Sequence, residues 1–200
     1  ALNHYQISLK ITKQINDKKG IMRAEINISN LYNTTGEYEK ALNSNRLCIE
    51  LCKKSNNHPL LAYSYNLSGV IYSNLSNYDE SIKNLKKILK IKRELNEPEG
   101  IASALKSIGM VYYKKGKYNQ AMIYHKKSLK QRESIDYPAG ISESLMNIAD
   151  TYRKKGEYED AIEYYKKSLH VTNKIKDQYN ASTILYRLGC MYRKKGEYDI

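Results

Sequence analysis

The chain has no tryptophan and no phenylalanine among its 200 residues, and only three prolines and three cysteines. An odd number of cysteines gives no framework of paired disulfides, which excludes a small disulfide-stapled secreted domain and favours a reducing, cytoplasmic compartment. No apolar run approaches the roughly 20 residues that a membrane-spanning helix needs. We therefore expect neither a membrane partner nor a disulfide scaffold.

Acidic residues are also comparatively few. The chain has 34 Lys and Arg against 21 Asp and Glu, a net charge of +13. Such an excess permits nucleic acid, anionic lipid or an acidic protein as partner. Most of it is Lys rather than Arg, and the chain is rich in Asn, Ile and Tyr, a composition typical of A/T-rich coding drift. The charge alone does not separate a selected binding surface from drift.

A 40-residue period runs through the whole chain. The segment 156–161, Gly-Glu-Tyr-Glu-Asp-Ala, recurs at 36–41 and 116–121, begins again at Gly196, and has a degenerate copy at 76–81. A fixed period of this size predicts stacked helical hairpins, which present a surface rather than a catalytic core. Two tyrosine series follow the same grid: Tyr32, Tyr72, Tyr112, Tyr152 and Tyr192, and Tyr38, Tyr78, Tyr118, Tyr158 and Tyr198.

Each period contains two helices. Apolar residues at helical spacing predict a first helix over 101–115, with small residues at the Gly109 position of every copy, where a second helix must approach closely. Gly116 ends this helix in the left-handed conformation, and Tyr118 begins the second helix. Pro138 and Pro98 suit the first turn of the following helices. Two helices of about 15 to 18 residues account for nearly all of the period.

We expect one array over residues 1–200, cut from a longer protein. Residues 1–20 form the second helix of a preceding repeat, residues 181–200 form the first helix of a further one, and four repeats lie between them: 21–60, 61–100, 101–140 and 141–180. Helix 181–195 lacks its partner and should expose part of a face formed by Leu185, Leu188 and Tyr192. We expect residues 1–17 of one molecule to dock on helix 181–195 of the next.

Two successive copies of the repeat share one spacing of apolar, small and aromatic residues: Leu105, Ile108, Gly109, Tyr112, Ala121 and His125, then Leu145, Ile148, Ala149, Tyr152, Ala161 and Tyr165. This spacing resembles the tetratricopeptide repeat, and the long period resembles that of kinesin light chains, spindle-orientation adaptors and prokaryotic signalling arrays. The resemblance implies an all-α, right-handed α-solenoid of antiparallel helix pairs, with about five 40-residue repeats and ten helices. It also implies binding of extended or helical segments of partner proteins.

In this family the first helices line the concave side, which implies a partner-binding groove that is polar in its first part and basic, with Tyr and Met interleaved, in its second. We expect a protein–protein interaction scaffold that binds an acidic peptide segment there. Alternatives are a basic array that binds nucleic acid, and a sensory or regulatory arm of a larger signalling enzyme or receptor. The groove residues are Asn30, Asn33, Tyr63, Asn66, Lys106, Met110, Tyr113, Lys114, Met146, Asn147, Arg153, Lys154, Tyr186, Arg187, Arg193 and Lys194.

No residues suggest catalysis, a metal or another cofactor. His125 occupies a packing position, and no glycine-rich loop could hold a phosphate. Cys48 occupies a core position, whereas Cys52 occupies one expected to point outward, where other copies carry Thr, Lys or Arg. With His58 the pair falls short of a closed zinc site. Lys106, Asn147 and Arg187 match three of the five positions with which some family members clamp the carboxylate of chaperone tails.

Overall fold

The computed structural model describes residues 1–196, which form ten α-helices and no strand. The chain divides into two compact units, Ala1–Ile91 and Lys92–Ile200. Tyr198 of the second tyrosine series, and the last four residues of the predicted helix region 181–200, lie outside the described residues. The predicted all-helical class is confirmed, and the two units are described in turn.

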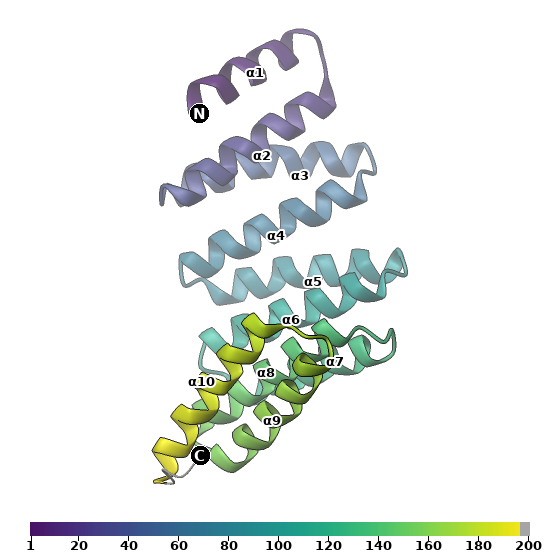
Figure 1. The fold of residues 1–200 in the computed structure, drawn as a ribbon. Helices are drawn as coiled ribbons and strands as arrows, with labels where there is room; N and C mark the ends of the chain where they lie inside the picture. Colours follow the sequence, from purple (N-terminus) through teal and green to yellow (C-terminus); the bar gives the residue numbers. More distant parts are fainter. Residues whose placement is uncertain (197–200) are drawn as a thin grey trace. The chain divides into compact units, whose positions relative to one another are not determined.

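In the first unit, successive helices run antiparallel (Figure 1). Its core includes a cluster around Met22, Ile26 and Cys48 and another around Leu67 and Ile71. Tertiary burial of these apolar stripes, rather than intrinsic propensity, provides most of the stability of such helices. The helices are α1 (Leu2–Gln14), α2 (Lys18–Thr34), α3 (Tyr38–Lys54), α4 (His58–Asn74) and α5 (Tyr78–Glu94), within which the boundary between the units falls.

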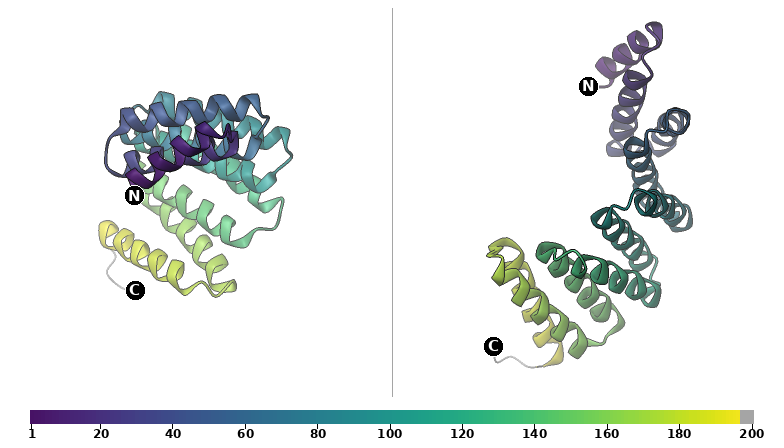
Figure 2. Two further views of the ribbon diagram at one scale, coloured as in Figure 1. Left: turned by 90° about the horizontal axis from the view of Figure 1, so that it is seen from above. Right: turned by 90° about the vertical axis from the view of Figure 1, so that its right-hand side faces the viewer.

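The second unit repeats the pattern, and Figure 2 shows its helices in two further views. One core cluster joins α8, α9 and α10 through Ala149, Ala161, Tyr165, Ile184 and Leu188. The helices are α6 (Pro98–Lys114), α7 (Tyr118–Glu133), α8 (Pro138–Lys155), α9 (Tyr158–Lys174) and α10 (Gln178–Lys195). Pro98 and Pro138 begin α6 and α8, as predicted.

Every helix ends at a left-handed residue. After the first helix of each pair this residue is a glycine, with φ from 76° to 82°, except for Ser76 at 58°. The sequence predicted this for Gly116. It did not predict that the second helices end likewise, at Asn16, Asn56, Asn96, Asp136 and Lys176. Asn and Asp tolerate this conformation better than other residues with a Cβ, because their short side chains hydrogen-bond locally.

The helices of a pair cross where the sequence placed small residues. A Cβ added at Gly109 would lie 2.6 Å from Cε1 of His125, and one added at Gly69 would lie 3.3 Å from Leu85. Ser29 and Ala149, at the same position of other pairs, are fully buried. The close approach inferred from the small residues is therefore present in both units.

The prediction that Cys52 points outward was wrong. Its side chain is fully buried, and at the same position of later repeats Arg132 is only 4% exposed. The last turn of each second helix packs against the first turn of the next helix, so that the side chain of Arg132 lies against Gly140. The polar residues at this position in other repeats suggested an exposed side chain, but Arg132 is buried with its charge satisfied by hydrogen bonds.

The predicted exposed face of α10 was half right. Leu185 is 55% exposed, as expected. Leu188 is buried instead, because it packs into the cluster around Tyr165 and Ala161, and Tyr192 packs at the edge of that cluster.

Candidate partner-binding surface

Asp150 organises the surface formed by the first helices of the second unit, α6, α8 and α10, which we call the first-helix face. Its carboxylate accepts a 2.6 Å hydrogen bond from the buried Tyr165 hydroxyl. It also pairs with Arg153, at 3.3 Å, and with Arg187 of α10. Arg153 in turn donates to the hydroxyl of Tyr113, at 3.5 Å. Three of the predicted groove residues, one from each helix, thus meet around one acidic side chain.

This arrangement raises the pKa of two tyrosines. Burial raises the pKa of Tyr165 well above its usual range, and the adjacent Asp150 charge adds to the effect. Burial and the Asp150 charge also raise the pKa of Tyr113. Both hydroxyls therefore stay protonated at physiological pH and act as hydrogen-bond donors or acceptors.

Glu143 is the second acidic centre of the first-helix face. Its two carboxylate oxygens pair with Lys106 of α6, at 2.8 Å, and with Arg132 of α7, at 2.7 Å. Burial alone would raise the pKa of Glu143, but the hydrogen bonds and charges of Lys106 and Arg132 outweigh it and lower the pKa. The buried Arg132 also donates to the Gly140 carbonyl, at 2.6 Å. Lys106, predicted as a groove cation, is therefore already in an ion pair.

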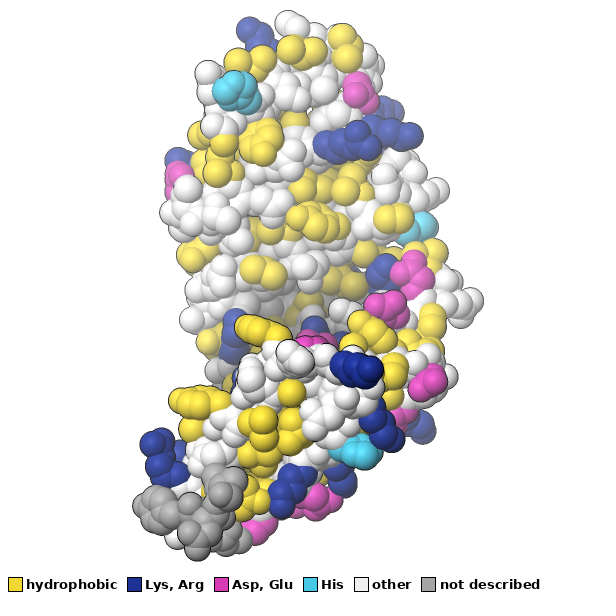
Figure 3. Space-filling model, in the orientation of Figure 1, with side chains coloured by type: hydrophobic (Ala, Val, Ile, Leu, Met, Phe, Trp, Pro, Cys, Tyr) yellow, Lys and Arg dark blue, Asp and Glu magenta, His cyan; other side chains and the backbone are white. Residues whose placement is uncertain are grey.

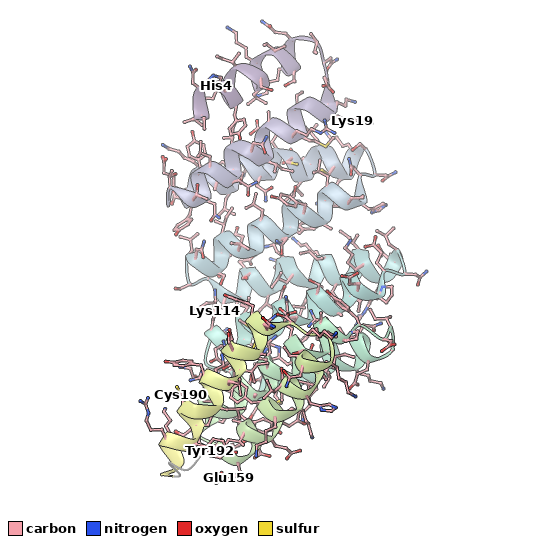
Figure 4. The ribbon with its side chains drawn as sticks, in the orientation of Figure 1. His4, Lys19, Lys114, Glu159, Cys190 and Tyr192 are labelled. Carbon is pink, nitrogen blue, oxygen red and sulfur yellow. The ribbon has the colours of Figure 1, made fainter. Side chains whose placement is uncertain are left out.

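Three further predicted cations belong to neither network within residues 1–196. Lys154 and Arg193 are exposed and make no ion pair there. Lys194 lies over the ring of Tyr158, 5.7 Å from its centroid. Lys114 lies at the C-terminal end of α6 (Figure 4). Because each of the two carboxylates pairs with two cations, the networks themselves also keep a net positive charge.

The remaining predicted residues of this unit are neutral. Met110 and Tyr186 are exposed, and Met146 and Asn147 are half-buried. A cavity of about 290 Å³ lies beside Met146 and Glu143 and is also lined by Asn180 and Ile184. Its size suits one or two side chains of a ligand rather than a whole small molecule, since ligand pockets usually exceed about 300 Å³.

The corresponding face of the first unit carries neutral polar side chains that hydrogen-bond to one another. Asn30 of α2 donates to the hydroxyl of Tyr63 of α4, at 3.0 Å, and Asn74 donates to Asn33, at 3.2 Å. Asn66 is exposed on the same helix as Tyr63. Three of the four predicted residues of this unit thus take part in hydrogen bonds that join the neighbouring first helices α2 and α4.

Sequence reasoning did not assign a role to Asp150 or Glu143. Both occupy first-helix positions that carry other residue types in other repeats, which was the available signal, but three of their five partners lie 15 to 37 residues away. The pairings also bear on the carboxylate-clamp comparison. Lys106 and Arg187, two of its three matching donors, are bound to Glu143 and Asp150.

Nothing in residues 1–196 groups three or more His, Cys, Asp or Glu side chains as a metal site would. Cys48 and Cys52 have free thiols, with their sulfurs 3.7 Å apart in the core. Over the same residues, every helix is too short or too polar to cross a bilayer.

Sequence comparison establishes the family. The tetratricopeptide repeat model matches residues 60–134 and 140–200, more than half of the chain, so the protein belongs to the tetratricopeptide repeat family. No curated protein matched the sequence.

Solved structures share the fold at low sequence identity. BtubC (BKLC) from P. vanneervenii is 17% identical with a TM-score of 0.81, covering 98% of this chain and 84% of its own. Apo RapI is 16% identical with a TM-score of 0.82; the match covers 96% of this chain, which spans about half of RapI, 53%. The Rap conjugation gene regulator of plasmid pLS20, in complex with the Phr* peptide, is 17% identical with a TM-score of 0.72, covering 94% of this chain and 52% of its own.

Proposed function

We propose that this chain is a non-catalytic scaffold that binds an acidic peptide segment, extended or helical, along its first helices. The observation that carries the proposal is the linked set of polar side chains on α6, α8 and α10, centred on Asp150, with Lys154 and Arg193, which make no ion pair within residues 1–196, exposed on the same helices. Fixed donors next to exposed cations are suited to carboxylates of a partner chain. A similar fold holds a peptide in the pLS20 Rap regulator, which supports this class of ligand.

All sixteen predicted groove residues belong to this proposal, with Asp150 and Glu143 added as the side chains that orient them. The proposal includes one continuous array with the repeat boundaries given above. It also includes a cytoplasmic location, which the three free thiols support, since reducing compartments keep thiols unpaired.

The test is affinity capture from a host lysate, with and without nuclease. The bait variant is Lys154→Glu with Arg193→Glu, because both side chains are exposed and neither pairs with Asp150, so reversal leaves the Asp150 network intact. The matched control is Lys126→Glu with Lys130→Glu, on the exposed side of α7, which makes the same change in net charge. We expect a protein that survives nuclease, binds the control and is lost on the bait variant.

Loss of capture on nuclease treatment would instead identify the basic surface as a nucleic-acid site and overturn the proposal. Binding would then weaken steeply with salt, because each neutralised phosphate releases counterions.

We propose as a second interaction that copies of this chain stack head to tail, with residues 1–17 docking on helix 181–195. Leu185, Tyr179 and Tyr186 are exposed on α10, whose outward side carries apolar side chains in Figure 3. A Cβ added at Gly189 would meet nothing within 4 Å, although the equivalent Gly109 is covered by His125. On α1, Ser8 is exposed, whereas the equivalent Ser128 is buried.

Light scattering over a wide concentration range tests this contact. The expected result is a mass that rises with concentration and becomes monomeric in Leu185→Lys. Ile123→Lys, a matched change of an exposed apolar residue on α7, should have no effect. A monomeric mass for the unmodified chain at every concentration would overturn the proposal.

A further inference from the structure

Tyr72 is the exception in its series. The other four tyrosines of the series contact a ring or a cation: Tyr112 stacks on Tyr124, Tyr152 stacks on Tyr164, Lys40 lies over Tyr32 and Lys166 lies over Tyr192. Within residues 1–196, Tyr72 has no such ring or cation neighbour. It is only half-buried, so an aromatic surface is left uncovered.

The reason is a single position in the following helix. Tyr124 and Tyr164 both stack on the tyrosine of their own pair, with ring centroids 5.4 Å apart. In α5 the same position is Asn84, whose amide turns back to the carbonyl of Glu80, at 2.9 Å. Asn84 is too short to cover Tyr72, and the space that a tyrosine ring fills in the second unit remains open.

A cavity of about 500 Å³ occupies this place. We call it the α3–α5 trough, because it lies between those two helices over α4. Its volume is within the range of ligand-binding pockets. Tyr72 and Asn84 line it, together with the apolar side chains Leu42, Ile49 and Tyr65.

Charges along the α3–α5 trough are segregated by sign. Glu39 and Glu80 come from the first turns of α3 and α5, whereas Arg46, Lys53 and Lys87 come from farther along these helices. Within the described part of the chain, the three cations make no ion pair, although Glu80 pairs with Lys83.

Lys87 shows the effect of this crowding. Its ammonium lies over the ring of Tyr65, 4.8 Å from the centroid. Burial and the nearby charges of Lys53 and Lys83 lower the pKa of Lys87. A bound carboxylate would relieve this repulsion, so the cationic end of the trough favours an anionic group.

We propose that the α3–α5 trough is a second peptide site, distinct from the first-helix face, for an aromatic side chain followed by acidic residues. The aromatic ring stacks on Tyr72 in the place that Tyr124 and Tyr164 fill in the other unit. The acidic residues that follow it reach Arg46, Lys53 and Lys87. Stacked aromatic pairs contribute on the order of 1 kcal/mol beyond burial, and charge-assisted hydrogen bonds add to this.

The probe is an N-acetylated, C-amidated peptide of one Trp followed by three Glu. This chain has no tryptophan, so the emission of the probe reports its own binding. We expect saturable binding, with amide shifts at Tyr72, Asn84 and Lys87 in nuclear magnetic resonance spectra. The same peptide with Leu in place of Trp should bind at least tenfold more weakly. Equal binding of both peptides, or no saturation, would overturn the proposal.

Two substitutions at one position provide the matched pair. Asn84→Tyr supplies the ring that the second unit carries and should weaken probe binding at least tenfold, whereas Asn84→Ser, the residue of the preceding repeat at Ser44, should keep it. Tyr72→Leu removes the stacking surface by a different route and should also weaken binding. Helical circular dichroism establishes that each variant is folded.

The first-helix variant, Lys154→Glu with Arg193→Glu, separates the two sites. It should keep the probe-induced amide shifts at Tyr72, Asn84 and Lys87. If this variant loses the probe while Asn84→Tyr retains it, the peptide binds the first-helix face and the second site does not exist.

Discussion

At the residue scale, His125 is the least satisfied polar side chain of the second unit. It is almost fully buried, and neither ring nitrogen has a hydrogen-bond partner. In the next repeat Tyr165 fills the same position and donates to Asp150. In the repeat of His125, the position of Asp150 is occupied by Met110, which offers no such acceptor. Burial lowers the pKa of His125 to about 4, while Asp150 and Glu143 partly oppose this effect.

His125 should therefore make stability depend on pH. Because its folded-state pKa lies below the ordinary value of about 6.5, the unfolded chain takes up the proton first, and stability falls between about pH 6.5 and 4, by about 3 kcal/mol. His125→Leu introduces the residue that the preceding repeat has at this position, Leu85, and should remove this loss. Urea unfolding at several pH values measures it. The exposed His170→Leu is the control, and an unchanged slope in His125→Leu would contradict the assignment.

Asp150 should matter more than its partly exposed position suggests. Asp150→Ala leaves the buried Tyr165 hydroxyl and two guanidinium groups without their acceptor, and an unsatisfied buried group costs about 1–3 kcal/mol. We expect a loss of about 2 kcal/mol in the free energy of unfolding. In the background of Tyr165→Phe, Asp150→Ala should cost less, because one partner is already gone. Additive effects in this double-mutant cycle would show that the two side chains are not coupled.

The sequence predicted which residues lie on the first-helix face but not which of them form ion pairs. Spacing alone placed Lys106, Arg153 and Arg187 on first helices. It could not show that Glu143 and Asp150 pair with them, because ion pairing depends on rotamers and, for Lys106 and Arg187, on residues 37 positions apart. Tyr72 shows the same limit, because its uncovered ring face is evident only from the contacts that the equivalent tyrosines make in other repeats.

At the element scale, the left-handed residues that end the helices account for most of the regular spacing of the helices. The left-handed stop after α4 is Ser76, with φ of 58°, where the other copies have glycine. A residue with a Cβ costs about 1–2 kcal/mol in this conformation. Ser76→Gly should therefore stabilise the first unit by about 1 kcal/mol in urea unfolding. Asn56→Gly should change stability less, because Asn tolerates the left-handed region, and an equal gain at both positions would contradict this account.

Helix crossings allow a second element-scale prediction. Gly109→Ala should destabilise the second unit, because the new Cβ would meet His125 at 2.6 Å. Gly189→Ala should stabilise it by about 0.5–1 kcal/mol, since the site is open and alanine is the better helix former. Thermal unfolding compares the two variants. Destabilisation by Gly189→Ala would mean that a further helix covers that site in solution, as in the head-to-tail contact.

At the scale of the whole molecule, the net charge of +13 is the dominant property. Like charges repel within the folded chain, and salt shortens their range from about 30 Å at 0.01 M to about 8 Å at 0.15 M. The melting temperature should therefore rise over this interval of sodium chloride. A fall would show that the ion pairs of Asp150 and Glu143, rather than the repulsion, dominate the electrostatics.

The fold was predictable at this scale because the same sequence pattern recurs in each 40-residue period. The Tyr and Gly grid, the small residues at the crossings and the prolines at helix starts agree with one another, and the helices begin and end where these signals lie. Burial at the Cys52 position was not predictable from residue type, because one repeat satisfies it with a thiol and another with a hydrogen-bonded guanidinium.

The left-handed residues recur at every twentieth position from 16 to 196, at twice the frequency of the sequence repeat. Each hairpin thus carries its own stop signals and needs none from its neighbours. Unequal recombination that adds or removes one 40-residue block of the gene leaves every remaining stop in phase. The length of such a protein can therefore change in whole hairpins during evolution, without intermediate forms in which a helix loses its end.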